Sequence, residues 1–230
     1  NTPITYTPFT VGWDGTWLDD GVTTRAGASF NFHVSGLGAS EQEFADKRFK
    51  GRPSYAYLRG TASQERALGE GWGLNWRGGW QLSGQPLVSN EQFAIGGVDT
   101  VRGYLESAAL GEQGVHLNLE GLSPNLSARL GSLAGTFKEV RAIGFADAGH
   151  VRVVDPITAT SRLTLASVVL GVRARSGGGV VAELLWALHR ASFPLFPAAS
   201  AAGFTPWSLT YAPLATFNAA RVAFDGLTSL

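Results

Sequence analysis

A repeating alternation of apolar and polar residues constrains the fold of this chain more than any other feature. In its clearest stretch, residues 72–83, one set of alternate positions is apolar: Trp72, Leu74, Trp76, Trp80 and Leu82. The positions between them include the polar residues Asn75, Arg77, Gln81 and Ser83. Successive side chains of a β-strand point to opposite faces, whereas an amphipathic helix repeats about every 3.6 residues. The pattern therefore predicts strands that are apolar on one face and polar on the other.

The same period of two returns along most of the chain. The segments that carry it are 9–17, 26–34, 55–62, 72–83, 115–120, 140–148, 166–175 and 180–189. They are joined by short turns, such as Asp19-Asp20-Gly21, and by longer polar stretches, such as the charged segment 36–53. Segments and connections together predict about eight antiparallel strands.

Two architectures use strands of this kind: a soluble β-sandwich with a solvated outer face, and a membrane β-barrel with a polar lumen. Several segments run to about ten residues, the length that a tilted membrane strand needs, whereas strands of globular proteins average about 5–6. Short and long connections alternate, and Trp and Tyr recur near strand ends, as in membrane barrels. The sequence therefore favours an all-β fold, an antiparallel transmembrane β-barrel, over the sandwich.

Composition argues against several other functions. The 230 residues carry no net formal charge, so nothing indicates a nucleic-acid partner. There is no cysteine, which rules out disulfides and cysteine-based zinc sites. The four histidines are scattered without metal-ligand spacing: His33, His116, His150 and His189. Three of them lie on or near polar strand faces, where a solvated histidine is predicted. No nucleotide-binding loop or catalytic motif is present, so we predict no enzyme, no cofactor and no small-molecule substrate.

The stretch from Glu91 to Tyr104, EQFAIGGVDTVRGY, lies between two of these strand segments. Its Gly96-Gly97 pair permits backbone conformations that are closed to other residues. A single arginine, Arg102, follows on a tight turn of small residues. The composition indicates a loop built to place one guanidinium, although on these residues alone an ordinary surface loop is the alternative.

The end of the chain departs from the alternating pattern. Residues 191–230 are predicted to be an irregular tail, because prolines interrupt 193–215 and proline is excluded from paired strands: Pro194, Pro197, Pro206 and Pro213. A short alternation over 221–225 leaves open one more, divergent strand. The chain contains no methionine, so residue 1 is not expected to be a natural start.

Two motifs resemble one known family. The segment EQFAIGGVDTVRGYLESAALGEQG closely resembles a loop of the TpsB transporters, the two-partner secretion proteins of the haemolysin-activator and filamentous-haemagglutinin-exporter (ShlB/FhaC/HecB) type. A second family motif, G-F-x-D-x-G, is present as residues 144–149. The resemblance covers roughly Thr5 to His189, and the two motifs occur in the family's order. The TpsB transporters belong to the wider superfamily of outer-membrane barrels that carry POTRA domains.

The resemblance implies a barrel of sixteen strands preceded by two periplasmic POTRA domains. This chain would supply roughly the C-terminal half, eight to nine strands over residues 1–190, with a lumenal loop at 85–114. In the family the loop folds back into the lumen, and its arginine engages the aspartate of the second motif, so a salt bridge between Arg102 and Asp147 is implied. The implied loop residues are Phe93, Gly96, Gly97, Val101, Arg102, Gly103 and Tyr104. The implied barrel-wall residues are Gly144, Phe145, Asp147 and Gly149.

The resemblance also implies a function and a location. The protein would be a translocation pore in the outer membrane of a Gram-negative bacterium, exporting a large secreted exoprotein in two-partner (type V) secretion. Its partners would be that exoprotein and the bilayer with its lipopolysaccharide. A barrel-assembly or surface-antigen protein of the same superfamily is one alternative, and a soluble β-sandwich binding module is another. The number of POTRA domains, absent from this sequence, and the partition of the protein between water and detergent would discriminate among them.

Overall fold

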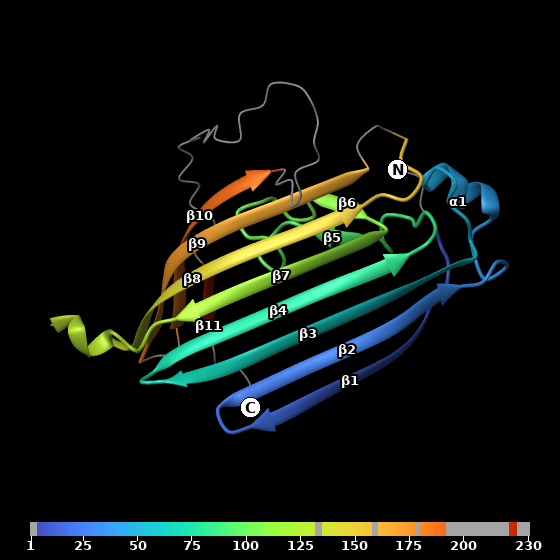
Figure 1. Cartoon of the computed structure of the whole chain (residues 1–230). Helices are drawn as coiled ribbons and strands as arrows, with labels where there is room; N and C mark the ends of the chain where they lie inside the picture. The colour runs from blue at the N-terminus through green and yellow to red at the C-terminus, as the bar shows by residue number, and fades with distance from the viewer. Residues whose placement is uncertain (1–3, 132–134, 158–160, 178–179, 192–220, 225–230) are drawn as a thin grey trace, which may run out of the picture.

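A single antiparallel sheet dominates the computed structural model, which describes residues 4–131, 135–157, 161–177, 180–191 and 221–224 (Figure 1). Its strands, in spatial order, are β1 (Phe9–Asp19), β2 (Val22–His33), β3 (Tyr55–Gly69), β4 (Trp72–Ser83), β7 (Gln113–Leu122), β8 (Phe137–Arg152), β9 (Arg162–Ser176), β10 (Val180–Ala191) and β11 (Arg221–Phe224). Two short strands, β5 (Phe93–Ile95) and β6 (Ala109–Gly111), form a separate pair. The predicted all-β, antiparallel fold is confirmed, with nine strands in the main sheet.

The tight turns lie at one end of the strands, which also carries the longer connection 123–136 between β7 and β8. At this end β1–β2 and β3–β4 are joined by tight turns, and Glu70 and Gly71 both have positive φ, as a two-residue hairpin turn requires. The connections at the other end include residues 34–54, 84–112 and 153–161, and the first two are the longest among the described residues. The middle one is the predicted lumenal loop, whose observed limits are 84–112 because β7 begins at Gln113.

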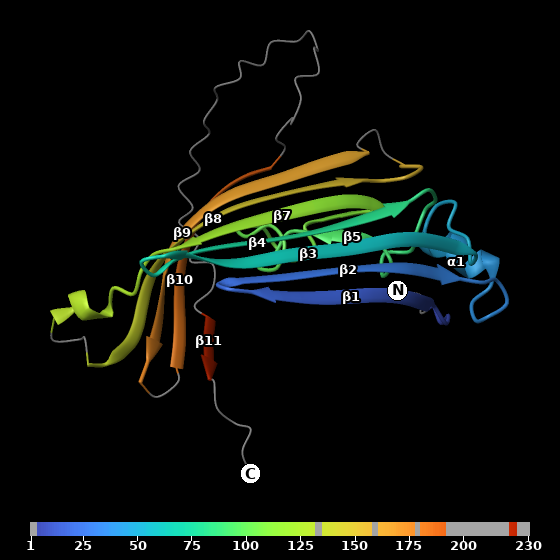
Figure 2. The ribbon, with the colours of Figure 1, turned by 60° about the horizontal axis from the view of Figure 1, so that its bottom comes forward.

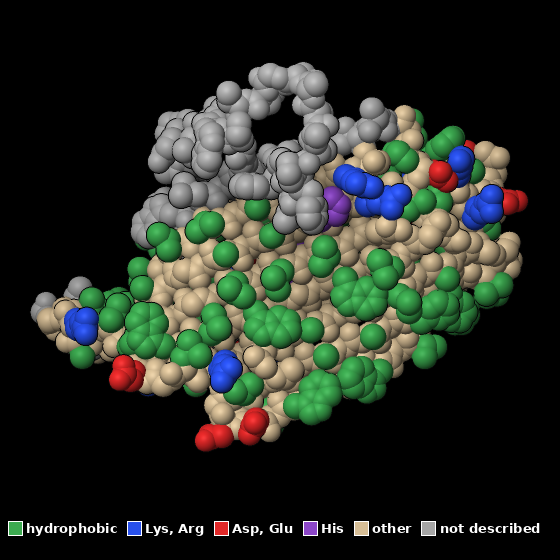
Figure 3. Space-filling model, viewed as in Figure 1, with side chains coloured by type: hydrophobic (Ala, Val, Ile, Leu, Met, Phe, Trp, Pro, Cys, Tyr) green, Lys and Arg blue, Asp and Glu red, His purple; other side chains and the backbone are tan. Residues whose placement is uncertain are grey.

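In a soluble protein the apolar face of a sheet is buried and the polar face is exposed. In this sheet the two faces are the other way round. The convex face exposes large apolar side chains, among them Trp80, Leu117 and Leu170, the last 64% exposed. Figure 3 shows this face, with hydrophobic side chains spread over the strands and charged ones gathered near the strand ends. The opposite face buries polar side chains such as Gln81 and Asn118. Alternation along β4 and β7 therefore directs polar groups inward and apolar groups outward, as predicted from the sequence.

The sheet curves around its polar face, as the edge-on view in Figure 2 shows for β7 to β10. The β5–β6 pair lies on that same inner face and contacts β7 and β8. No helix in the described part of the chain is long and apolar enough to cross a membrane.

Segment 34–54 contains a helix that the sequence pattern did not predict. Helix α1 (Glu41–Lys47) begins at a capping box, in which the Ser40 hydroxyl accepts from the Glu43 backbone and the Glu43 carboxylate accepts from the Ser40 backbone. That backbone N–H, and next the Ser40 hydroxyl, lower the pKa of Glu43. The helix has only seven residues and follows a run of turn-forming residues. In the sequence its charged residues therefore look like part of a polar loop, which is why the helix was not predicted.

The prediction of a solvated histidine is wrong for His33. Its side chain is buried, and its ring stacks on Phe44 of α1 and on Tyr55 of β3. Its ring nitrogens lie near two backbone carbonyl oxygens, Nδ1 at 2.5 Å from that of Pro53 and Nε2 at 2.9 Å from that of Leu37, so the nitrogen that carries the proton donates to a carbonyl in either tautomer. The sequence placed His33 on the polar face correctly, but it did not reveal that segment 34–54 covers that end of the face.

The C-terminal segment contains one described strand. β11 pairs antiparallel with β10, with Arg221 opposite Glu183 and Phe224 opposite Val180. This strand falls where the sequence left a divergent strand open. The predicted Pro-rich irregularity lies outside the described residues, which resume only at Arg221.

Candidate functional site

The connection 84–112 folds back across the inner face of the sheet and forms a small body of its own. Phe93 pairs with Gly111 and Ile95 with Ala109, closing the β5–β6 ladder. Its apolar side chains pack with two residues of the wall in one buried cluster: Phe93, Ile95, Val101, Ala109, Val151 and Leu165. The loop is therefore packed against β8 and β9.

Gly149 of β8 makes the close packing possible. A Cβ atom at this position would lie 2.9 Å from a methyl group of Val101 and 3.1 Å from one of Ile95. Both contacts are shorter than ordinary van der Waals separation, so any larger residue would push the loop away from the wall. The close contact between loop and wall therefore explains why the second motif ends in a glycine, Gly149.

The tip of the loop is a turn that presents Arg102. Gly96 and Gly97 both have positive φ, 104° and 100°, a conformation that residues with a Cβ rarely adopt. The Thr100 hydroxyl accepts a hydrogen bond from the Gly96 backbone N–H at 2.8 Å and donates to the Gly96 carbonyl at 3.0 Å. Asn118 of β7 donates its amide to the Thr100 carbonyl, which fastens the turn to the wall.

Arg102 binds Asp147 of β8 in a bidentate ion pair. The guanidinium Nε lies 2.7 Å from Oδ2 and Nη2 lies 2.7 Å from Oδ1, and the Arg102 backbone N–H donates to Oδ2 at 3.1 Å. The Asp147 side chain is fully buried and the Arg102 side chain is 11% exposed. A buried carboxylate requires a countercharge and several donors, and Arg102 supplies both.

Further wall residues surround the guanidinium. Its carbon lies 3.5 Å from the centroid of the Phe145 ring, in cation–π contact. Glu120 of β7 approaches it at 3.6 Å and also meets Arg173 of β9 at 3.5 Å. Tyr104 donates its hydroxyl to the Ala166 carbonyl at 3.0 Å. The tip is thus held by three neighbouring strands.

The structure brings together most of the residues singled out in the two motifs. Gly144 is the exception in the second motif. It lies opposite Leu170 in the β8–β9 register, and a Cβ there would meet only Leu170, at 3.7 Å. Glu120 was not predicted as part of the site, although its position on the polar face of β7 was the available signal.

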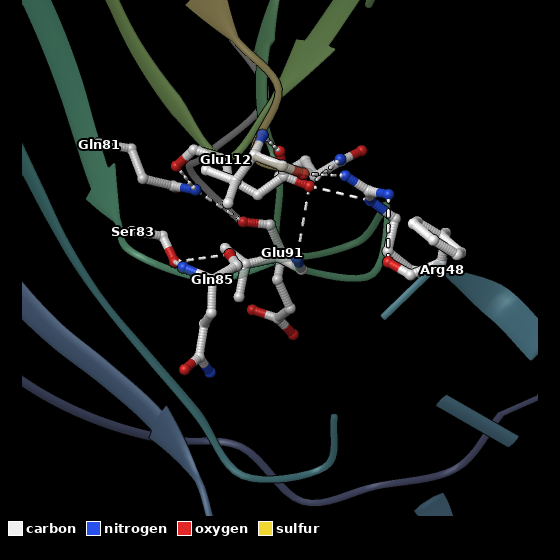
Figure 4. A network of polar contacts seen from close by, with 10 residues as sticks. Arg48, Gln81, Ser83, Gln85, Glu91 and Glu112 are labelled. Carbon is white, nitrogen blue, oxygen red and sulfur yellow. Dashed lines mark hydrogen bonds and ion pairs between the residues drawn. The ribbon is translucent and has the colours of Figure 1, made fainter. Parts of the chain in front are cut away.

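A second polar network holds the base of the loop, and its members come from distant parts of the chain (Figure 4). The fully buried Glu112 carboxylate accepts from Arg48 at 3.0 Å and from the Gln92 amide at 2.7 Å. It also accepts from the backbone N–H groups of Leu87, at 3.3 Å, and Val154, at 2.7 Å. None of these contacts was anticipated from the sequence.

Glu91 forms the other half of this base. Its carboxylate accepts hydrogen bonds from the hydroxyls of Tyr6 at 2.6 Å and Tyr57 at 2.7 Å. Burial, followed by the bond to Glu91, raises the pKa of Tyr6 well above its usual value. The Gln81 amide donates to the backbone carbonyl of Glu91 at 2.9 Å and to that of Glu112 at 3.3 Å.

The contacts at this site attach the loop to the strands of the wall. Among the described residues, no group of three or more His, Cys, Asp or Glu side chains is arranged to hold a metal ion. Charges on the loop and the wall are matched to each other, and the loop crosses the polar face of a sheet whose other face is apolar. These features define a wall of a membrane β-barrel that carries a loop on its polar inner face.

A comparison with protein families assigns the chain within this class. Residues 5–174 match the family model of the haemolysin secretion/activation proteins ShlB/FhaC/HecB, and the chain belongs to this family. The match spans both motifs. The resemblance predicted from the sequence is confirmed.

Solved structures show the same fold. CdiB from Escherichia coli superposes with a TM-score of 0.64 at 24% sequence identity, over 80% of this chain and 33% of CdiB. The chain therefore spans about one third of the length of that protein. None of the curated protein sequences compared with the chain matches it.

Proposed function

We propose that this chain is part of an outer-membrane pore that exports a large exoprotein partner by two-partner (type V) secretion. The proposal rests on one observation above all. A loop is fastened across the polar face of a sheet whose opposite face is apolar, through the ion pair of Arg102 with Asp147. Family membership supports the same function. Export would need no catalytic residue and no cofactor.

The orientation of the sheet in the membrane follows from its connections. Membrane barrels of the outer membrane have short turns on the periplasmic side and longer loops on the outside. The end with connections 34–54, 84–112 and 153–161 is therefore assigned to the cell surface, and the end with the turn at Glu70-Gly71 to the periplasm. The loop enters the lumen from the surface side. The apolar face contacts the bilayer and, in its outer leaflet, lipopolysaccharide.

Each motif residue except Gly144 has a proposed role in placing the loop. Arg102 and Asp147 fix its tip, and Phe145 supports the guanidinium through its ring face. Four residues shape the turn: Gly96, Gly97, Gly103 and Tyr104. Three others allow the loop to pack against the wall: Phe93, Val101 and Gly149. The exoprotein would pass through the lumen beside this loop.

The alternatives are less well supported. A soluble β-sandwich would bury one face of the sheet against a second sheet, whereas here the face with Trp13, Trp80 and Leu170 is exposed. A barrel-assembly protein would share the barrel and the loop. The family match favours the secretion role over it.

A secretion assay with a matched arginine control tests the proposal. The full-length protein is produced with its exoprotein in a Gram-negative outer membrane, and either Arg102→Ala or Arg25→Ala is introduced. Arg25 faces the same lumen, but its exposed side chain pairs with Glu65 of the neighbouring strand. We expect both variants to insert as heat-modifiable barrels, and only Arg102→Ala to lose most of the exoprotein from the medium.

Normal secretion by Arg102→Ala would reject the role given to the loop. Equal loss in both variants would show that any lumenal arginine matters. Partition of the wild-type protein into the aqueous phase, without detergent, would reject the membrane pore itself.

A further inference from the structure

Segment 34–54 contacts the base of the lumenal loop through two residues one helical turn apart. Phe44 of α1 is 1% exposed and packs with Leu87 and Val88, at the start of the loop, and with Tyr55 and Tyr57 of the wall. Arg48 follows at the end of the helix and reaches Glu112, at the far end of the same loop. One surface segment therefore touches both ends of the loop.

Glu112 joins three connections that the sequence separates widely. Its carboxylate receives Arg48 from segment 34–54, Leu87 and Gln92 from the loop, and Val154 from segment 153–161. Arg48 also donates to the Val154 carbonyl at 2.6 Å. These three connections thus meet at this one carboxylate.

Arg48 contributes the positive charge that faces the Glu112 carboxylate. The other described donors to that carboxylate are neutral, one side-chain amide and two backbone N–H groups. The Glu112 side chain is fully buried and that of Arg48 is 12% exposed. Removal of one partner from a buried ion pair leaves an uncompensated charge, which is strongly unfavourable. The closed arrangement of the three connections therefore depends on Arg48.

We propose that α1 and Arg48 form a clasp that closes the surface mouth over the base of the lumenal loop, with Glu112 as its catch. This inference rests on the proposed pore and concerns how its loop is positioned. Arg48 and Glu112 are positioning residues, separate from the Arg102–Asp147 pair at the tip. Release of the clasp exposes Leu87 and Val88 to the cell surface while the tip remains attached.

A thiol placed under the clasp reports its opening. The chain has no cysteine, so Val88→Cys, at a position 4% exposed, introduces one reactive group. A membrane-impermeant maleimide is applied to intact cells that produce the full-length protein without its exoprotein. The rate of labelling, relative to the amount of heat-modifiable barrel, is compared with that of the parent protein without the introduced thiol.

The expected order of labelling rates follows from the charge on Glu112. Val88→Cys alone is labelled slowly, and added Arg48→Ala raises the rate by roughly a hundredfold or more, because loss of one partner from a buried ion pair is strongly unfavourable. Glu112→Gln in the Arg48→Ala background lowers the rate again, because no unpaired charge remains. Arg52→Ala, in an exposed residue of the same segment, leaves the rate unchanged.

Two results would overturn the clasp. One is labelling of the Arg48→Ala variant at the Val88→Cys rate, and the other is no decrease on adding Glu112→Gln. If Arg48→Ala does not assemble, Arg48→Lys takes its place, with a rate clearly above that of Val88→Cys alone expected and an unchanged rate as the contrary result. Labelling without exoprotein is independent of export, so a failed secretion assay would leave this test valid.

Discussion

The guanidinium of Arg102 lies over the ring of Phe145, with its central carbon 3.5 Å from the ring centroid, and it also binds the carboxylate two residues further along the same strand. A planar guanidinium can offer its face to an aromatic ring and its edge to a carboxylate at once, which an ammonium group cannot do. The second motif therefore supplies both partners from one face of β8, since residues 145 and 147 share that face.

Substitution of Phe145 by leucine should weaken the tip without breaking the ion pair. The cation–π contact contributes about 0.5–2 kcal/mol, so we expect Phe145→Leu to lower secretion less than Arg102→Ala does. Secretion by Arg102→Lys should fall more than by Phe145→Leu, since lysine loses the bidentate geometry as well. Exoprotein in the medium measures both, and a larger loss for Phe145→Leu would contradict the order.

Two carboxylates near Arg102 should differ in their importance. Asp147 makes two contacts of 2.7 Å and is fully buried, whereas Glu120 lies at 3.6 Å and is partly exposed. Loss of a buried partner costs about 3–5 kcal/mol. We expect Asp147→Asn to destabilise the loop much more than Glu120→Gln, as a lower unfolding temperature of the detergent-purified full-length protein. Equal shifts would argue against Asp147 as the main anchor.

The two glycines of the second motif provide a matched pair. Gly149→Ala places a methyl group 2.9 Å from Val101, whereas Gly144→Ala meets only Leu170 at 3.7 Å. Overpacking costs about 1–3 kcal/mol, so Gly149→Ala should displace the loop and reduce secretion. Gly144→Ala should behave like the wild type. A reduction of secretion by Gly144→Ala alone would reject the packing explanation.

Leu170 tests the assignment of the apolar face to lipid. It lies near the middle of β9 and is 64% exposed. Arginine near the bilayer midplane costs about 2–4 kcal/mol, so Leu170→Arg should reduce the yield of heat-modifiable barrel. The control Thr61→Arg lies on the lumenal face of β3 and should insert normally. If only Thr61→Arg failed to insert, the face with Thr61 would be the one in contact with lipid, and the assignment would be wrong.

The sequence was sufficient for the strands and their faces because both are local properties of the backbone. Alternation along residues 72–83 directed Gln81 inward and Trp80 outward, and the structure agrees. The partners at the base of the loop were not predictable in this way. Arg48 and Glu112 are 64 positions apart, and a contact at that separation leaves no local pattern. The helix that precedes Arg48 is too short to show a helical period.

The tip was easier to anticipate than the base because a family motif marks it. On residues alone, Arg102 could have belonged to an ordinary surface loop. The geometry that distinguishes it, a backbone N–H and a guanidinium on one carboxylate, depends on how β8 passes beneath the turn. That relation is set by the whole sheet, not by the loop sequence.

The β5–β6 pair gives the loop its own internal backbone hydrogen bonds, from Phe93 to Ile95 on one side and Ala109 to Gly111 on the other. Its ties to the wall at the tip are made largely by side chains, so it can part from the wall without losing that ladder. A polypeptide that passes the loop would then displace it as one folded unit, and the loop could return to the wall without having to refold.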